Sequence, residues 1–329
     1  MGREAPGVRR GTGTVPGMSS TAHDPPLPPP RVEEVSDGVY AYLQPDGSWW
    51  INNAGFLAGR RGVVVIDACS TERRTRAFRA AIGEVTDRPI TTLVNTHHHG
   101  DHTFGNWLFP EATIVGHEGV RDQILAEGVP AYRSAWSSEV DWGRHEPAPP
   151  FLTFTDRVTV HSDDLRCEVR HVGHAAHTTS DSYVWIPERR LLFAGDLVFN
   201  GGTPFVLMGS LEGALRALGQ LRELGAETVV PGHGEVCGPW AYEPVERYLR
   251  FVQETAARGR EAGLTPLETA RETDLGEWAG LLDAERLVGN LHRAYAELDG
   301  RPLGAPIDVA AAVRDMVAYN GGRPLSCLA

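Results

Sequence analysis

The clearest chemical signal in the sequence is the histidine-rich segment Thr96–His102, which reads THHHGDH. His97 and His99 alternate, so one loop can aim two imidazole rings at the same metal ion, and imidazole is a good ligand for zinc. Asp101 and His102 follow directly and can present a carboxylate and another imidazole to a second ion. The alternative is a solvated histidine-rich turn, but a chance match to His-x-His-x-Asp-His is rare, at roughly one in a thousand chains of this length. The segment therefore predicts a metal site.

Three residues further along the chain supply ligands that this loop lacks. They are His177, Asp196 and His233, and each follows a segment predicted as a strand. Because ligand sites gather at the carboxyl ends of strands, we expect all three to converge with the histidine loop on one sheet edge.

Alternating strands and helices are expected to position these residues. The predicted strands are Val39–Leu43, Ile51–Ala58, Val63–Asp67, Ile90–Asn95, Thr113–Val115, Leu165–His171, Ser182–Ile186, Leu191–Ala194 and Thr228–Val230. The short first strands and their turn signals indicate an antiparallel start. The predicted helices are Thr71–Val85, Leu211–Leu224 with Ser210 as N-cap and Gly225 as stop, and a mostly helical region from about Tyr242 that includes Glu285–Leu298 and Ile307–Tyr319.

This ordered set of motifs resembles the metallo-β-lactamase-fold hydrolases over roughly residues 33 to 240, and the set is far more specific than any one motif. The resemblance implies an α/β fold, a four-layer αββα sandwich with metals between the edges of two sheets. It also implies two zinc ions per chain, the first bound by His97, His99 and His177, the second by Asp101, His102 and His233, with Asp196 bridging both. Asp101 is in addition the candidate catalytic residue.

A bridging Asp with no Cys in the corresponding segment is similar to the glyoxalase II, lactonase and thioesterase branches, and argues against a β-lactam as the main substrate. The resemblance therefore implies a dinuclear zinc-dependent hydrolase, in which a metal-bridging hydroxide attacks an ester, thioester or lactone carbonyl of a small-molecule acyl substrate. The alternative is a zinc-dependent aromatic polyketide cyclase/thioesterase of bacterial secondary metabolism, acting on a carrier-protein-bound substrate. The tail segments Asn290–Tyr295 and Met316–Pro324 resemble those of such enzymes.

Several other positions keep two interpretations. Asp67 could accept a hydrogen bond from a ligating histidine or cap the next helix. The ring of His98 should point away from its neighbours' metal, and His174 is a weaker ligand candidate than the histidine that follows it. Trp49 and Trp50 could cover an apolar or planar substrate, although either residue alone is more typical of a core.

Composition narrows the classes of partner. The net charge is -12 and all 31 basic residues are Arg, so the clustered positive charge that binds a phosphate backbone is not expected, and no nucleic acid partner is predicted. No apolar run approaches the ~18 residues that span a bilayer, and no hydrophobic signal segment is evident, so we expect no membrane partner and a cytoplasmic location. The 4 cysteines are scattered singly and predict ordinary thiols.

The same patterns predict three regions. Residues 1–30 are rich in Pro and Gly and are expected to form a disordered leader. Residues 31–262 are expected to form the metallo-β-lactamase-fold catalytic domain, and residues 263–329 a helical C-terminal extension.

Overall fold

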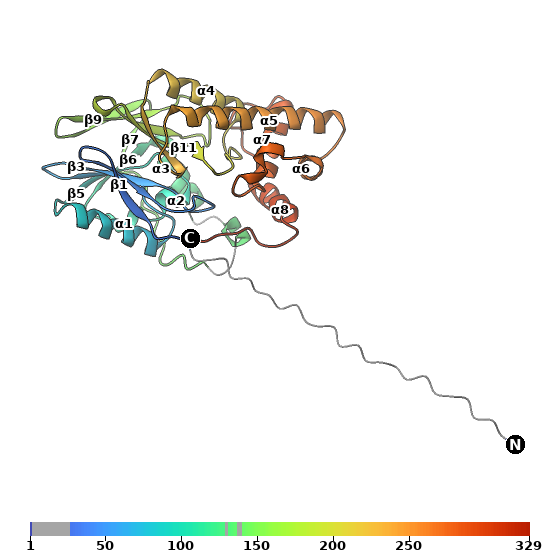
Figure 1. Ribbon diagram of the computed structural model, residues 1–329, viewed down its shortest axis with the longest axis horizontal. Helices are drawn as coiled ribbons and strands as arrows, with labels where there is room; N and C mark the ends of the chain where they lie inside the picture. Colours follow the sequence, from blue (N-terminus) through green and yellow to red (C-terminus); the bar gives the residue numbers. More distant parts are fainter. Residues whose placement is uncertain (2–26, 129–130, 137–139) are drawn as a thin grey trace.

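Two β-sheets form the centre of the computed structural model, which describes residues 1, 27–128, 131–136 and 140–329 (Figure 1). The leader expected over residues 1–30 lies largely outside the described residues. The first sheet is antiparallel from β1 to β4 and parallel from β4 to β7, which confirms the predicted antiparallel start. In sheet order its strands are β1 Arg31–Ser36, β2 Val39–Leu43, β3 Ala54–Ala58, β4 Val63–Ile66, β5 Ile90–Val94, β6 Thr113–His117 and β7 Leu152–Phe154.

The second sheet has the order β12-β11-β10-β9-β8. Its only parallel pair is β11 with β12, and a helical crossover, α4, joins these two strands. The strands are β8 Arg157–Ser162, β9 Leu165–His171, β10 Ser182–Ile186, β11 Leu191–Asn200 and β12 Thr228–Gly234.

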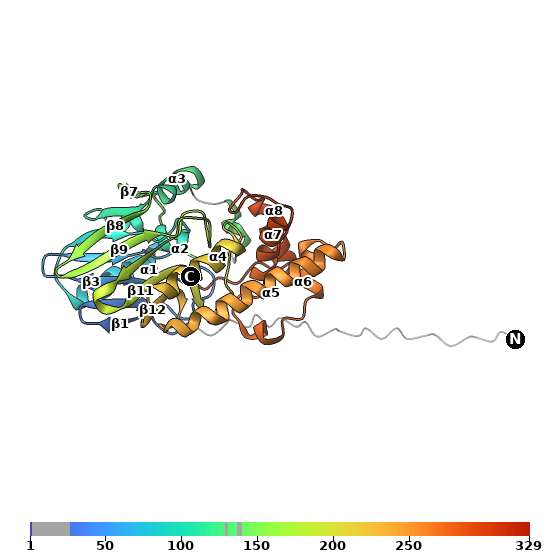
Figure 2. The same ribbon diagram turned by 90° about the horizontal axis from the view of Figure 1, so that it is seen from above.

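The two sheets pack face to face, and helices cover their outer faces (Figure 2). Between the sheets, β-branched and aromatic side chains such as Ile66, Val184 and Phe193 form one buried cluster. On the outer face of the first sheet, Phe78 and Ile82 of α1 (Glu72–Val85) pack on the strands. The outer face of the second sheet is covered by α4 (Leu211–Glu223) and α5 (Tyr242–Glu261). This arrangement is the predicted four-layer αββα sandwich.

Local sequence explains where the covering helices begin. The Thr71 hydroxyl accepts a hydrogen bond from the Arg74 amide at 3.2 Å and caps α1, while the Ser210 hydroxyl accepts from the Gly213 amide at 3.0 Å and caps α4 as predicted. The chain leaves α4 through Gly225 at φ +66°, a left-handed conformation that favours glycine. Both helices therefore follow their predicted bounds to within one residue.

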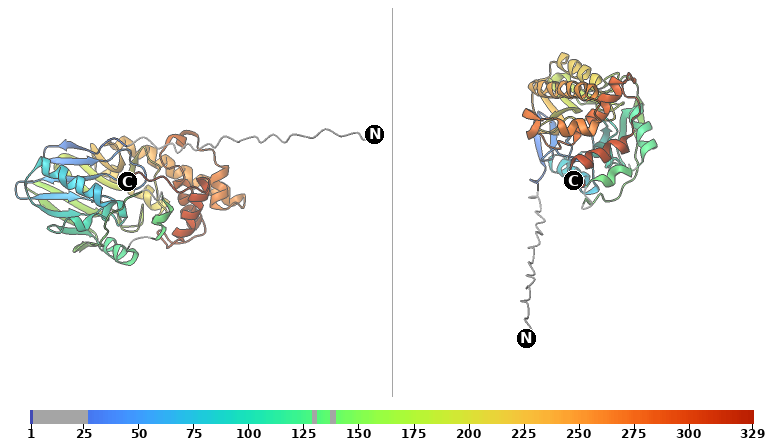
Figure 3. Two further views of the ribbon diagram at one scale, coloured as in Figure 1. Left: turned by 90° about the horizontal axis from the view of Figure 1, so that it is seen from below. Right: turned by 90° about the vertical axis from the view of Figure 1, so that its right-hand side faces the viewer.

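The C-terminal helices α6 (Pro266–Glu272), α7 (Arg286–Leu298) and α8 (Val309–Tyr319) pack on α5 and on one another (Figure 3), and the last residues return to α1 and to the 3-10 segment that ends at Ala135. The Leu325 amide donates to the Ala135 carbonyl at 3.0 Å, and the Arg74 guanidinium donates to the Leu328 carbonyl at 2.8 Å. In the part of the chain that the structure describes, none of the helices combines the length and apolar character needed to cross a bilayer.

Some elements escaped prediction. The sequence analysis did not identify β1, β7, β8, α2 (Gly100–Thr103) or α3 (Glu118–Glu127). Strands β1 and β8 lie at sheet edges and are largely exposed, so they lack the apolar pattern of a buried strand. Strand β11 is longer than predicted because the apolar run resumes beyond Asp196 and continues to Asn200. Short 3-10 helices occur at Asn106–Leu108, Ala131–Ala135, Pro187–Arg189, Pro239–Ala241 and Gly276–Gly280.

Candidate metal centre

The histidine loop follows the end of β5, as predicted, and runs directly into α2, the short helix that the sequence did not reveal. Strand β5 ends at Val94, and the side-chain amides of Asn95 and Asn106 exchange hydrogen bonds of 3.1 and 2.8 Å beneath the loop. The Thr103 hydroxyl is within hydrogen-bond distance of the carbonyls of His98 and His99, at 3.0 and 2.9 Å. These contacts fix the loop backbone, so the rings it carries need no rearrangement to meet a ligand.

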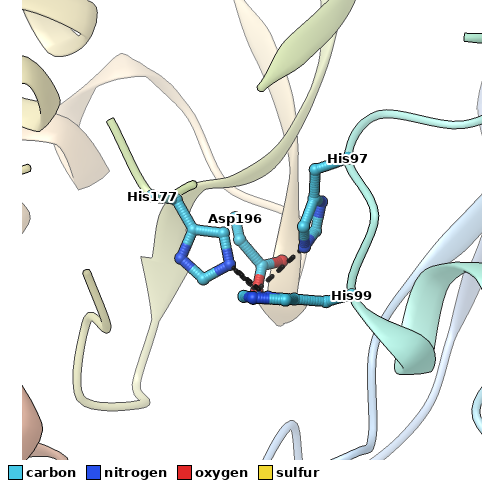
Figure 4. A group of neighbouring side chains, drawn as sticks. All are labelled: His97, His99, His177 and Asp196. Atoms are coloured by element: carbon cyan, nitrogen blue, oxygen red, sulfur yellow. Dashed lines mark hydrogen bonds and ion pairs between the residues drawn. The ribbon is translucent and has the colours of Figure 1, made fainter. Parts of the chain in front are cut away.

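The first group of potential metal ligands brings His97, His99, His177 and Asp196 together (Figure 4). Their ligand atoms lie within 4.8 Å of one another. The His177 Nε2 lies 2.8 Å from the His99 Nδ1 and 3.3 Å from the Asp196 Oδ2, and the His97 Nε2 lies 4.0 Å from the same oxygen. Three imidazoles and one carboxylate converge, a donor set typical of a zinc site.

The second group consists of Asp101, His102, His233 and again Asp196, also within 4.8 Å. The His102 Nε2 lies 3.0 Å from the Asp196 Oδ1, and the His233 Nε2 lies 3.2 Å from the Asp101 Oδ2 and 3.3 Å from the Asp196 Oδ2. Asp196 is thus common to both groups, and its two oxygens are available to neighbouring ions.

These ligand candidates come from both sheets, so the expectation of a single sheet edge is wrong. The histidine loop extends from the first sheet, whereas His177 precedes β10 and belongs to the second. Asp196 and His233 also do not follow their strands as predicted but lie within β11 and β12, where the pairing register shifts between Gly195 and Phe199. The irregular pairing lets a polar side chain leave a buried strand toward the gap between the sheets.

Hydrogen bonds at the far side of three rings set which nitrogen faces the centre. The Nδ1 of His177 lies 2.5 Å from the Phe205 carbonyl, and the Nδ1 of His233 lies 3.0 Å from the Gly47 carbonyl. The Nδ1 of His102 lies 2.8 Å from the Asp67 Oδ2. Because these oxygens only accept, each Nδ1 carries a proton and each Nε2 is the nitrogen directed at the centre.

Asp67 orients ligands of both groups. Besides its bond to His102, its carboxylate accepts the Thr96 amide at 2.8 Å and the Thr96 hydroxyl at 2.7 Å. That hydroxyl oxygen lies 3.1 Å from the Nδ1 of His97, so it can accept the ring proton in turn. The helix-capping alternative for Asp67 is wrong, since Thr71 caps α1.

Burial dominates the electrostatics of the first group. It holds the pKa of His97 well below its usual value, and the neighbouring His102 adds to this. Burial and the adjacent His177 do the same for the pKa of His99. The Nε2 atom of His97 is buried and has no hydrogen-bond partner among the described residues, while the nitrogen of His99 that faces the group, Nδ1, lies 2.8 Å from the His177 Nε2. Neutral rings with unpartnered nitrogens are what a metal ion requires of its ligands.

In the second group, carboxylates outweigh burial. Burial alone would lower the pKa of both rings, but Asp196 and Asp101 raise the pKa of His102 well above its usual value and that of His233 to about 9. Burial would raise the pKa of Asp196, yet His233 and His102 hold it well below its usual range. Without a metal, protons on the histidines balance the carboxylates, and a divalent cation fits the same place.

A pocket opens onto both groups, with about 830 Å³ of free space including its mouth. Aromatic side chains dominate its walls, among them both Trp49 and Trp50, which are buried at 8% exposure each. From the sequence, each of these two residues could belong to the hydrophobic core or cover a substrate. In the structure both belong to the core and also line the pocket. His98 lines the pocket too, with its Nε2 3.5 Å from Glu127, whereas His174 does not.

Comparisons with known proteins agree with this geometry. Residues 47–233 match the model of the family described as the metallo-beta-lactamase superfamily. A linear primary-alkylsulfatase from a Pseudomonas strain is 24% identical over 319 residues, covering 80% of this chain and 59% of that protein. A hydroxyacylglutathione hydrolase from Rhodospirillum rubrum is 31% identical over 147 residues, covering 43% of this chain and 46% of that protein. This chain therefore spans only about half the length of these curated relatives.

A solved structure supports the fold. A metallo-beta-lactamase from Pontibacter korlensis superposes with a TM-score of 0.57 at 19% identity, covering 68% of this chain and 99% of that one. At this identity the likeness concerns the sandwich alone.

Proposed function

We propose that this chain, which belongs to the metallo-β-lactamase superfamily, is a dinuclear zinc-dependent hydrolase of an ester, thioester or lactone. The two curated relatives named above are hydrolases. The observation that carries the proposal is the pair of ligand groups that share Asp196. Two groups within reach of one carboxylate suit two ions at the spacing of dinuclear hydrolases. The acyl substrate follows from the Asp-bridged ligand set and from the name of the hydroxyacylglutathione hydrolase.

In this proposal His97, His99 and His177 would hold the first ion and Asp101, His102 and His233 the second, and Asp196, which belongs to both groups, would be shared between them. Bound zinc would supply Lewis-acid polarisation of the carbonyl and would make water a nucleophile at neutral pH.

The protein's own groups then orient the reactants and move the proton. Asp101 is the more exposed of the two carboxylates, at 12% of its side chain against 4% for Asp196, and both line the pocket. We assign Asp101 the catalytic role of accepting, at a carboxylate oxygen, the proton that the attacking water releases. The aromatic walls of the pocket exclude bulk water, which strengthens the electrostatic interactions at the reacting carbonyl.

The test combines metal content with turnover. The purified chain should contain about two zinc ions per molecule and should hydrolyse members of a panel of thioesters, esters and lactones. His99→Ala should lose zinc and lower kcat/KM by about 100-fold or more. His174→Ala is the matched control, because this histidine belongs to neither ligand group and does not line the pocket, so both readouts should stay unchanged.

The outcomes separate the alternatives. Retention of both metals and activity by His99→Ala would contradict the ligand assignment. Two zinc ions without turnover of any simple substrate would favour the polyketide cyclase/thioesterase alternative with a carrier-bound substrate, and absence of bound metal would refute both.

A further inference from the structure

Five rings form what we call the aromatic box, defined as Trp49, Trp50, Phe104, Trp136 and Phe205. They all line the pocket over the ligand groups and come from separate parts of the chain. The loop after β2 supplies the first two, and the residue after α2 and the 3-10 segment near Ala135 supply the next two. An organic group attached to a carbonyl at the metal centre therefore meets mainly ring surfaces.

The rings hold one another in fixed orientations. Trp49 is perpendicular to Trp136 and to Phe205, with centroids 5.2 and 5.1 Å apart and interplanar angles of 76° and 81°. Trp50 stands at 86° to Trp136 and stacks on Phe104 at 5.7 Å. Edge-to-face and stacked contacts of this kind are the favoured geometries of aromatic pairs. The box is thus formed before any substrate enters.

The backbone and the C-terminal helices reinforce the box. Trp50 has φ +66°, a conformation that bulky residues rarely adopt, so the fold holds this indole in place against a local cost. The indole N–H of Trp49 donates to the Glu285 carboxylate at 2.7 Å, and the Arg286 guanidinium lies 4.1 Å from the centre of the Trp49 ring. The wall is therefore rigid on the side of α7.

Among the described residues that line the pocket, no cationic side chain is free to pair with a substrate. Arg286 is the only Arg among the described lining residues, and it is 2% exposed. Its guanidinium is committed to Asp283 at 2.9 Å and to the Thr203 carbonyl at 3.0 Å. Burial, with the nearby charge of Arg133, lowers the pKa of His145 and so disfavours a positive charge on this lining ring. Glu127 adds a negative charge to the wall.

The geometry points to a substrate whose organic group is flat, aromatic and uncharged. The inference rests on the proposed hydrolase function and specifies its substrate class. A rigid aromatic group loses few rotations on binding, whereas a linear alkyl chain of equal area must freeze several, so a preformed box of rings favours the former. A glutathione or other anionic group would meet Glu127, and none of the described lining residues would offer it a free cation.

The experiment uses three thioesters that share one uncharged thiol, N-acetylcysteamine, and differ in the acyl group: 2-naphthylacetyl, octanoyl and acetyl. With the zinc-loaded full-length chain, we expect kcat/KM for the naphthylacetyl thioester to exceed that for the octanoyl thioester by about tenfold. Trp50→Leu should lower the naphthylacetyl value about fivefold to tenfold and the acetyl value by less than about twofold. Trp240→Leu is the control, because this tryptophan is 62% exposed and does not line the pocket.

A binding measurement keeps the inference testable without turnover. Titration calorimetry should show a lower Kd for 2-naphthylacetate than for octanoate, and Trp50→Leu should bring the two Kd values closer together. If Trp50→Leu does not fold, Phe205→Leu replaces it, since it removes another wall of the box. Absence of hydrolysis of every thioester refutes the proposed function but leaves the binding preference to be measured. Equal or greater activity and affinity for the octanoyl compounds, or an equal effect of Trp50→Leu on all substrates, overturns the inference.

Discussion

Replacing Asp67 by Asn should weaken the second zinc site without removing any ligand. The carboxylate accepts three hydrogen bonds, from the Thr96 amide and hydroxyl and from the His102 ring. The side-chain oxygen of the introduced Asn can still accept the hydrogen bond from the Thr96 backbone amide, but its NH2 group then faces two donors, the Thr96 hydroxyl and the His102 ring. The His102 ring must either lose its partner or move its proton to Nε2, and a proton on Nε2 blocks coordination.

The size of the effect follows from the bond that is lost. A hydrogen bond from a ring to a carboxylate contributes about 1.5–3 kcal/mol, so a loss of about 2 kcal/mol corresponds to roughly thirtyfold in affinity. This lies inside the range of about 10–100-fold that is typical when the partner of a metal-binding histidine is removed. The first site should weaken only about twofold to threefold, because His97 reaches Asp67 through the Thr96 hydroxyl.

Competition titration with a chromophoric zinc chelator at pH 7.5 would resolve the two affinities. Asp181→Asn is a matched control, because this buried carboxylate accepts the Thr178 amide and hydroxyl, each at 2.7 Å, and is not bonded to any of the described ligand rings. It should lower Tm and leave both affinities within about twofold. Unchanged binding at the second site of Asp67→Asn, or equal weakening by Asp181→Asn, would refute the reasoning.

Three further predictions concern stability. Chelation should lower Tm by about 10 °C or more in calorimetry, since each site contributes about 4 kcal/mol when free zinc exceeds Kd 1,000-fold; an unchanged Tm would argue against bound zinc. Gly213→Ala should lower the free energy of unfolding in urea by about 2–3 kcal/mol, because its Cβ would lie 1.7 Å from the Ala175 carbonyl oxygen. Gly219→Ala in the same helix has nothing within 4 Å of its Cβ and should raise that free energy by about 0.5–1 kcal/mol. A Gly213→Ala protein more stable than Gly219→Ala would contradict this prediction. Burial and the stacked His117 ring lower the pKa of His171 to about 4, so its contribution to stability is present above about pH 6.5 and is lost as pH falls toward 4. In a plot of the free energy of unfolding against pH, His171→Gln should reduce the slope between about pH 6.5 and pH 4 relative to the wild type. Parallel plots for the two proteins would refute this prediction.

Much of the metal centre was accessible from sequence because its ligands belong to few residue types and adjoin strong strand signals. Strands Val39–Leu43, Leu165–His171 and Ser182–Ile186 have their predicted bounds. Their alternating or continuous apolar character reflects burial against the facing sheet, so pattern and structure coincide. The two ligand groups contain the seven residues that the motifs single out, while their role as zinc ligands stays a prediction.

Other parts of the site leave little trace in the sequence. The carbonyls of Gly47 and Phe205 orient two ligands, but any residue has a carbonyl, so no residue type indicates them. Arg286 reaches the pocket from the C-terminal helices, across a separation in sequence that periodicity cannot bridge. Asp196 did carry a usable signal, because a single acidic residue within an otherwise apolar and buried strand needs a buried cation as its partner.

The short segment from Gly47 to Trp50 links the two functions of the site. Gly47 has φ +86°, and a Cβ there would lie 2.7 Å from the Gly234 amide nitrogen, so only glycine brings its carbonyl to the His233 ring. Two and three residues later the same segment supplies the rings of the pocket wall. The orientation of His233 depends on the backbone of this segment, whereas the fit of the substrate depends on its side chains. Substitutions at Trp49 and Trp50 can therefore alter which acyl group is accepted while zinc binding persists, but a substitution at Gly47 should affect both at once.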